Sequence, residues 1–147
     1  MVGCGSGSSS SSAPGDTVDN GTPAESNVLA ITVPNTPLYP NKPTVSVTVC
    51  EPGTANCQTV GNILLDTGSY GLRIFRQASA NVSLPPVLVG SSPLAECVSY
   101  LDGSANWGPV RRADVKLGGE IAAGVPIQII DAAYFSGAIP AQCREPN

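Results

Sequence analysis

The amino-acid sequence predicts an all-β protein, and three features support this class. Glycine (16) and proline (14) make up about a fifth of the 147 residues, and both favour turns over long helices. Charged residues are only 12% of the chain, against roughly 25% in typical globular domains. Short apolar runs are bounded by turn formers, and no segment keeps a sustained helical period.

The chain begins with a segment that we do not expect to fold. Residues 1–26 are Gly/Ser-rich and low in complexity, so they are predicted to form a disordered tether. Residues 27–147 are predicted to form the domain, which is long enough for one small core. Its first strand is predicted at residues 27–33, ahead of a proline-rich loop that runs through Pro43.

The next two strands are predicted to be joined by a turn. Residues 44–50 alternate apolar and hydroxyl side chains, which is the pattern of a half-buried strand. Residues 58–66 contain the continuous apolar run 63–65, which predicts a strand buried on both faces. Cys50 and Cys57 flank the turn-rich segment between these strands, so a disulfide that closes the hairpin loop is geometrically feasible.

Four further strands are predicted in the second half of the domain, separated by turn signals. Asp102-Gly-Ser104 marks a hairpin turn, and Gly118-Gly119 marks the next one. The strands themselves are predicted at residues 70–75, 96–101, 108–117 and 125–130.

The absence of histidine excludes several chemistries. It rules out Ser-His-Asp and Cys-His nucleophile systems, His-ligated zinc and imidazole acid–base catalysis. The net charge of −4, with only seven Lys and Arg residues, argues against nucleic acid, because phosphate binding needs a clustered basic face. No apolar run approaches the ~20 residues of a membrane-spanning helix. We expect no bound metal and no cofactor, so that catalysis would rest on carboxylates, hydroxyls or thiols.

The five cysteines indicate an oxidising compartment if they pair. With Cys50 and Cys57 bridged, Cys97 and Cys143 remain as a second pair and Cys4 is left over. The alternative is that all five are free, buried thiols.

The leftover Cys4 has an explanation of its own. Met1-Val-Gly-Cys4, followed by Gly and Ser, resembles the end of a bacterial lipoprotein signal, in which the cysteine is lipidated. The alternative is a Gly/Ser linker with a stray thiol. We therefore expect a bacterial envelope protein, lipid-anchored on the periplasmic or outer side, or a secreted one. Any contact with the membrane would be made only through the lipid on Cys4.

Asp66 is the most unusual position in the sequence. It follows three apolar residues and precedes Thr67-Gly68, so a carboxylate stands where a predicted buried strand breaks into a turn. A buried carboxylate needs hydrogen-bond donors, and the hydroxyls and backbone N–H groups of residues 67–69 can supply them. The alternative is that Asp66 only caps a turn, as Asp-x-Gly sequences often do.

Several motifs in the same order resemble one lobe of the pepsin-like and retropepsin-like aspartic proteases. Residues 63–69, with Asp-Thr-Gly-Ser after an apolar run, are similar to the active-site strand and loop of these enzymes. Residues 99–104, with Tyr-x-Asp-Gly-Ser, are similar to their flap hairpin. The further matching segments are residues 108–110, 113–119 and 125–130. The resemblance covers about residues 43–131 and implies an acid-protease-like β-barrel lobe. The whole chain also resembles the N-terminal part of an uncharacterised bacterial lipoprotein family built on this framework.

The resemblance implies a role for each residue of the active-site loop. Asp66 would be one carboxylate of a catalytic pair, and Thr67 would brace it through hydrogen bonds to the opposite lobe. Gly68 would permit the tight turn, and Ser69 would hydrogen-bond the Asp66 carboxylate.

The resemblance also implies roles in the flap. Tyr100 would cover the substrate from the region of the flap tip. Asp102, Gly103 and Ser104 would form the turn. Trp107 would extend the apolar wall of the flap or, as the alternative, belong to the core.

The chain departs from a complete lobe of this class. In aspartic proteases two carboxylates about 3 Å apart share one proton and activate a water between them. This chain has one Asp-Thr-Gly sequence and lacks the apolar-apolar-Gly segment that threads beneath the active-site loop in pepsin-like lobes. We therefore expect an incomplete lobe, truncated at its C-terminus and completed by a second lobe. The alternative is a homodimer like that of the retroviral proteases.

Two functions follow from the resemblance. The first is hydrolysis of a polypeptide substrate by water activated between Asp66 and a second Asp that this chain does not contain. The second is a catalytically inactive surface lipoprotein that binds peptides or an envelope partner. A third interpretation is a β-barrel whose turns match by chance, in which case Asp66 would lie far from the hairpin at residues 99–104.

Overall fold

The computed structural model describes residues 27–34, 41–135, 137 and 139–144. The predicted tether at residues 1–26 and the predicted lipidation site Cys4 lie outside the described residues. The described chain consists of strands and two short 3-10 turns, so the all-β prediction is confirmed.

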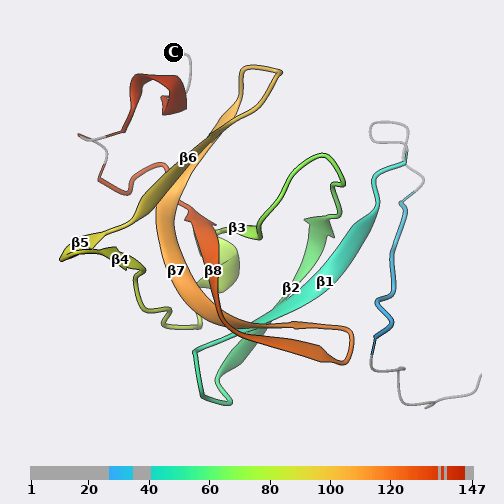
Figure 1. The fold of residues 1–147 in the computed structure, drawn as a ribbon. Coiled ribbons are helices and arrows are strands. Elements are labelled where there is room, and N and C mark those ends of the chain that lie inside the picture. Colours follow the sequence, from blue (N-terminus) through green and yellow to red (C-terminus); the bar gives the residue numbers. More distant parts are fainter. Residues whose placement is uncertain (1–26, 35–40, 136, 138, 145–147) are drawn as a thin grey trace, which may run out of the picture.

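Among the residues that the structure describes, the assigned elements are eight strands and two short 3-10 turns (Figure 1). The strands are β1 (Thr44–Cys50), β2 (Cys57–Leu64), β3 (Arg73–Phe75), β4 (Leu88–Val89), β5 (Ser92–Pro93), β6 (Ala95–Ser99), β7 (Ala105–Leu117) and β8 (Glu120–Ile130). The 3-10 turns are η1 (Arg76–Ser79) and η3 (Ala141–Cys143). The sequence did not predict the small β4–β5 hairpin, because each of its strands has only two residues.

The main sheet has six strands and is open. Its order is β2-β1-β7-β8-β3, and β6 pairs with the first half of β7. All of these pairs are antiparallel except β3 with β8, which is parallel. The outer strands β2 and β3 do not pair with each other, so within the described residues the sheet is not closed into a barrel. An open sheet agrees with the predicted incomplete lobe.

The core lies on one face of this curved sheet. Alternate residues of β1 enter it, as the period-two pattern of residues 44–50 predicted. The buried apolar cluster contains Val45, Val47, Val49, Val60, Ile74, Ala113, Val115, Ile127 and Ile129. Because β1, β2, β3, β7 and β8 all contribute, the cluster fixes the positions of the loops that leave these strands.

One close backbone approach and two hydrogen bonds to a side chain hold the long β7–β8 hairpin in place. A Cβ at Gly108 would overlap the carbonyl oxygen of Ile129, so this crossing requires glycine. Asp114 accepts hydrogen bonds from the backbone N–H groups of Gly53 at 2.8 Å and Gly124 at 2.7 Å. These two bonds hold the pKa of the Asp114 carboxyl below its usual value, and the bond from Gly53 makes the larger contribution. They tie the β1–β2 turn to β8.

The predicted first strand at residues 27–33 is wrong. This segment forms only an isolated bridge, in which Thr32 and Thr44 exchange two backbone hydrogen bonds of 2.8 Å. Val28, Ile31 and Val33 are exposed. A proline at position 34 has no N–H to continue a ladder, which limits the pairing to one residue pair.

The prediction that residues 63–65 form a strand buried on both faces is also wrong. Leu64 is 52% exposed and Leu65 is 39% exposed. The strand β2 is at the edge of the sheet and ends at Leu64, so this apolar run has a neighbouring strand on one side only. A continuous apolar run does not distinguish a central strand from an edge strand whose outer surface is uncovered.

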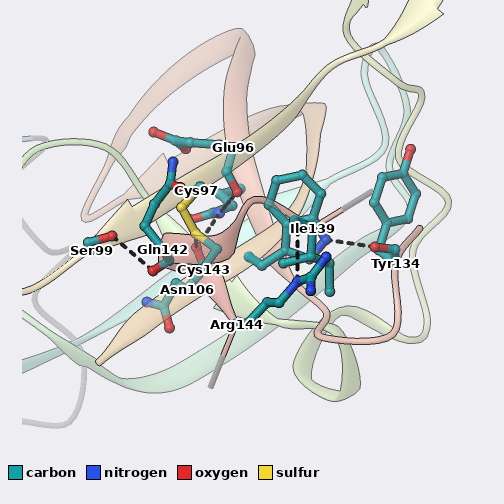
Figure 2. The surroundings of a disulfide bond; sticks show 11 residues. Glu96, Cys97, Ser99, Asn106, Tyr134, Ile139, Gln142, Cys143 and Arg144 are labelled. Carbon is teal, nitrogen blue, oxygen red and sulfur yellow. Dashed lines mark hydrogen bonds between the residues drawn. A yellow bond between two sulfur atoms is a disulfide. The ribbon is translucent and has the colours of Figure 1, made fainter. Parts of the chain in front are cut away.

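Both predicted disulfides are present. Cys50 is bonded to Cys57 across the β1–β2 hairpin, and Cys97 on β6 is bonded to Cys143 in η3. The second bridge therefore attaches the segment after β8 to the β6–β7 hairpin, as Figure 2 shows. Within the described residues, no helix has the length and apolar character needed to cross a membrane.

Candidate functional site

The loop after β2 carries the predicted active-site residues. Asp66, Thr67, Gly68 and Ser69 are all exposed and lie between β2 and β3. The backbone N–H of Gly68 donates a 2.8 Å hydrogen bond to Oδ1 of Asp66. This bond closes a tight turn around the carboxylate, so Asp66 does act as a turn cap, which was the alternative interpretation from sequence.

The same turn favours the ionised form of Asp66. The Gly68 N–H bond, together with a hydrogen bond from the Ser69 side chain, lowers the pKa of the Asp66 carboxyl below its usual value. Burial does not oppose this effect strongly, because the side chain is exposed. An exposed, ionised carboxylate can accept a proton or a hydrogen bond from a molecule that approaches the loop.

The β6–β7 hairpin carries the second predicted set. Its turn is closed by the Tyr100 N–H, which donates to the Ser104 carbonyl oxygen at 2.9 Å. The Gly103 N–H donates back to the Tyr100 carbonyl oxygen at 3.1 Å, and Gly103 has a φ of +86°, which favours glycine. The hairpin turn predicted from Asp102-Gly-Ser104 is therefore present.

Asp102 stabilises this turn. Its Oδ1 accepts hydrogen bonds from the Ser104 hydroxyl at 2.7 Å and from the Ser104 N–H at 2.9 Å. These bonds lower the pKa of the Asp102 carboxyl, the hydroxyl making the larger contribution. Both groups that donate to Asp102 belong to Ser104, within the same turn, so Asp102 stabilises the conformation of the hairpin tip.

One cavity brings the two motifs together. Its volume is about 520 Å³, and it is lined by Asp66 and Ser69 from the loop and by Tyr100 and Asn106 from the hairpin. Most of its remaining walls come from the two edge strands β2 and β3, including Leu64 of β2, and the rest come from Lys42, the β2–β3 loop, η1 and the end of β8. Figure 1 shows the β2–β3 loop and the β6–β7 hairpin extending toward the same end of the sheet. Asp66 therefore lies near the hairpin. The interpretation by chance similarity predicted the opposite, that Asp66 would lie far from it.

Part of the cavity lining is apolar and exposed. Leu64 and Phe75 line the cavity and are mostly exposed, and the cationic residues Lys42 and Arg73 line it as well. Exposed apolar side chains on a concave surface mark a binding surface more often than isolated ones do.

Asn106 is a site residue that the sequence did not reveal. Its side-chain amide donates a 2.8 Å hydrogen bond to the Tyr100 hydroxyl and so orients the tyrosine ring. One signal was available in the sequence. Neighbours on a strand point to opposite faces, so a buried Trp107 would place the polar side chain of Asn106 on the other face. Trp107 itself is buried and donates from Nε1 to the Tyr134 carbonyl oxygen at 2.6 Å. Of the two alternatives for Trp107, it is therefore the core aromatic.

The described residues contain no group of three or more Cys, Asp or Glu side chains that could hold a metal ion. Asp66 is the one carboxylate among the described residues that line the cavity.

The fold and the site together define an all-β domain with an open sheet, in which a carboxylate-bearing loop and a hairpin face one cavity. The chain belongs to the family described as "Protein of unknown function (DUF3443)", which matches residues 23–147. No curated protein and no solved structure matches the chain.

Proposed function

We propose that the cavity binds an extended polypeptide and that Asp66 is one carboxylate of an aspartic-protease-type pair. The observation that carries this proposal is that Asp66 and Ser69 line the same cavity as Tyr100, although the two motifs are far apart in the sequence. A polypeptide fits this surface because exposed apolar side chains, polar side chains and one carboxylate line the same cavity.

The reaction needs a second carboxyl group, which would come from a second lobe or from a second copy of this chain. Ionised Asp66 would take a proton from a water as its oxygen attacks the peptide carbonyl carbon. The second carboxyl, still protonated, would donate its proton to the carbonyl oxygen. The resulting gem-diol would then collapse: Asp66 would donate its proton to the leaving amine, a gem-diol hydroxyl would return a proton to the second carboxylate, and the C–N bond would break.

Two features of the surface support completion by a partner. Leu65 and Thr67 are exposed beside Asp66, where an opposite lobe would cover the apolar side chain and accept a hydrogen bond from the Thr67 hydroxyl. The two disulfides support a location outside the reducing cytoplasm, in the bacterial envelope or in the medium.

Asp66→Asn tests the proposal, with a full-length protein and an unfolded protein substrate at acidic pH. The substitution keeps the turn acceptor for the Gly68 N–H but removes the base, so cleavage should fall by about 10³-fold or more. The control is Glu120→Gln, which likewise removes the charge of an exposed carboxylate, here at the start of β8. Glu120 does not line this cavity, so its variant should keep its activity. Equal cleavage by the wild type and the Asp66 variant would refute the proposal.

A second candidate function is binding without catalysis. It is favoured by the single carboxylate among the described residues that line the cavity. In that case neither the wild type nor the Asp66 variant would cleave the substrate. Both would bind the same unfolded protein in a pull-down, and a Leu64→Asp variant would lose the binding.

A further inference from the structure

The β6–β7 hairpin has two faces with different partners. Tyr100 and Asn106 face the cavity. The other face is covered by the segment after β8, of which residues 131–135 and 139–144 are described and are called here the brace. The hairpin that carries Tyr100 is thus packed between the cavity and the brace.

Polar contacts attach the brace along the length of the hairpin. Trp107 donates from Nε1 to the Tyr134 carbonyl oxygen at 2.6 Å, and its own carbonyl oxygen accepts from the Asp131 N–H at 2.8 Å. Nearer the tip, the Ser99 hydroxyl donates to the Gln142 carbonyl oxygen at 3.4 Å (Figure 2). These contacts start at the base of the hairpin and reach the residue before Tyr100.

The Cys97–Cys143 disulfide is the one covalent link in this contact. It bonds the middle of β6 to η3 of the brace, as Figure 2 shows. Cys143 is buried, and its sulfur lies 3.9 Å from the carbonyl oxygen of Asn106, the residue that orients Tyr100. The 3-10 turn η3 has only three residues and packs on β6 and β7.

We propose that the brace positions the β6–β7 hairpin over the cavity and that reduction of the Cys97–Cys143 disulfide releases it. The brace residues are positioning residues, since none of those bonded to the hairpin lines the Asp66 cavity. In the reduced protein η3 detaches, the hairpin becomes mobile, and Tyr100 no longer holds a ligand in place. The inference rests on the proposed function in one respect: it assumes that the ligand binds in the Asp66 cavity.

The redox step is balanced by a dithiol as the reductant. One thiolate of the dithiol attacks a sulfur of the disulfide and forms a mixed disulfide, and the second thiolate displaces the other cysteine. Two electrons pass to the protein, two cysteine thiols form, and the dithiol becomes a cyclic disulfide. Cys97 is half-buried, so a small dithiol such as dithiothreitol reaches it more easily than Cys143.

The test compares two double variants of the full-length chain, each of which lacks one disulfide. Cys97→Ala/Cys143→Ala should speed amide hydrogen exchange in the hairpin tip, residues 99–106, by about tenfold or more. The matched control is Cys50→Ala/Cys57→Ala, which removes the bridge in the β1–β2 hairpin and should leave the tip unchanged. Fluorescence of Trp107, the only tryptophan in the chain, reports detachment of the brace as increased quenching by acrylamide.

A second measurement keeps the test valid if the Cys97/Cys143 variant does not fold. In a Cys4→Ala/Cys50→Ala/Cys57→Ala background, dithiothreitol reduces only the Cys97–Cys143 bridge of the already folded protein, and oxidation restores it. Reduction should reversibly raise the KM for labelled casein about fivefold or more with a smaller change in kcat. A mobile hairpin weakens substrate binding but does not displace Asp66.

The outcomes separate this inference from the proposed function. If Asp66→Asn has no effect on cleavage but the tip exchanges faster on reduction, the protease proposal fails and the brace stands. Unchanged exchange at residues 99–106 after reduction would overturn the inference. Equal acceleration in the tip and in the β1–β2 hairpin would also overturn it, because that result indicates only a global loss of stability.

Discussion

The two disulfides should contribute unequally to the stability of the domain. Cys50 and Cys57 are 7 residues apart in sequence, whereas Cys97 and Cys143 are 46 apart. A crosslink restricts the unfolded chain more strongly when it closes a longer loop. The chain-entropy relation then gives about 2.4 kcal/mol for the short loop and about 4 kcal/mol for the long one.

The comparison is well matched because each bridge joins one buried and one half-buried cysteine. Cys50 and Cys143 are 0% and 5% exposed, and Cys57 and Cys97 are both half-buried. The packing lost on substitution by alanine is therefore similar in the two double variants. The difference in the free energy of unfolding between them should be at least the entropic difference, about 1.7 kcal/mol, because detachment of η3 adds to the cost of losing the long-loop bridge.

Urea denaturation of the full-length protein under non-reducing conditions measures this difference. The fluorescence of Trp107 follows unfolding, and the change in midpoint at constant slope gives the change in free energy. The Cys97→Ala/Cys143→Ala variant should be the less stable of the two. If the Cys50→Ala/Cys57→Ala variant lost as much stability or more, loop closure would not be the main contribution of these bridges.

Further predictions concern other parts of the structure. Gly108→Ala should cost about 3 kcal/mol or more in thermal unfolding, because its Cβ would overlap a backbone carbonyl of β8, whereas Gly61→Ala should cost less than about 1 kcal/mol; equal costs would contradict the close approach. Carboxylates with a lowered pKa stabilise the fold above pH ~4 and lose that effect as the pH falls through their folded pKa, so stability should drop below pH ~4. Asp114→Asn should make that drop shallower in urea titrations at pH 2–6, and an unchanged pH dependence would contradict its role. Asn106→Leu should free the Tyr100 hydroxyl and raise the KM for casein with little loss of thermal stability, and an unchanged KM would show that this hydrogen bond does not orient the ring.

Much of the fold could be predicted from local pattern. The period-two alternation of residues 44–50 predicted β1 with its bounds, because side chains of a strand alternate between the core and the other face. The turn residues Gly103 and Gly118 were predicted as turn positions, and both have positive φ. The Cys50–Cys57 disulfide was predicted from the turn between the two cysteines and Cys97–Cys143 as the remaining pair, and both are present.

Sequence pattern did not predict which strands would lie at the edge of the sheet. The run at residues 63–65 has the composition of a central strand, yet β2 has a neighbour on one side only. Residues 27–33 have the composition of a strand, yet they make a single bridge. In both cases burial depends on partners from elsewhere in the chain, and local composition carries no information about them.

The sequence by itself determined the all-β class, the turns and a chemistry without histidine, because each of these depends on residue identity and short-range spacing. The Cys50–Cys57 pair also follows from short-range spacing, whereas Cys97–Cys143 was only the pair that remained. Only the tertiary structure decided that Asp66 and Tyr100 share a cavity, that Asn106 orients the tyrosine, and that Trp107 faces the brace. These relations join residues on separate strands. They follow from the pairing and curvature of the sheet, which arise from contacts between parts of the chain that are distant in sequence.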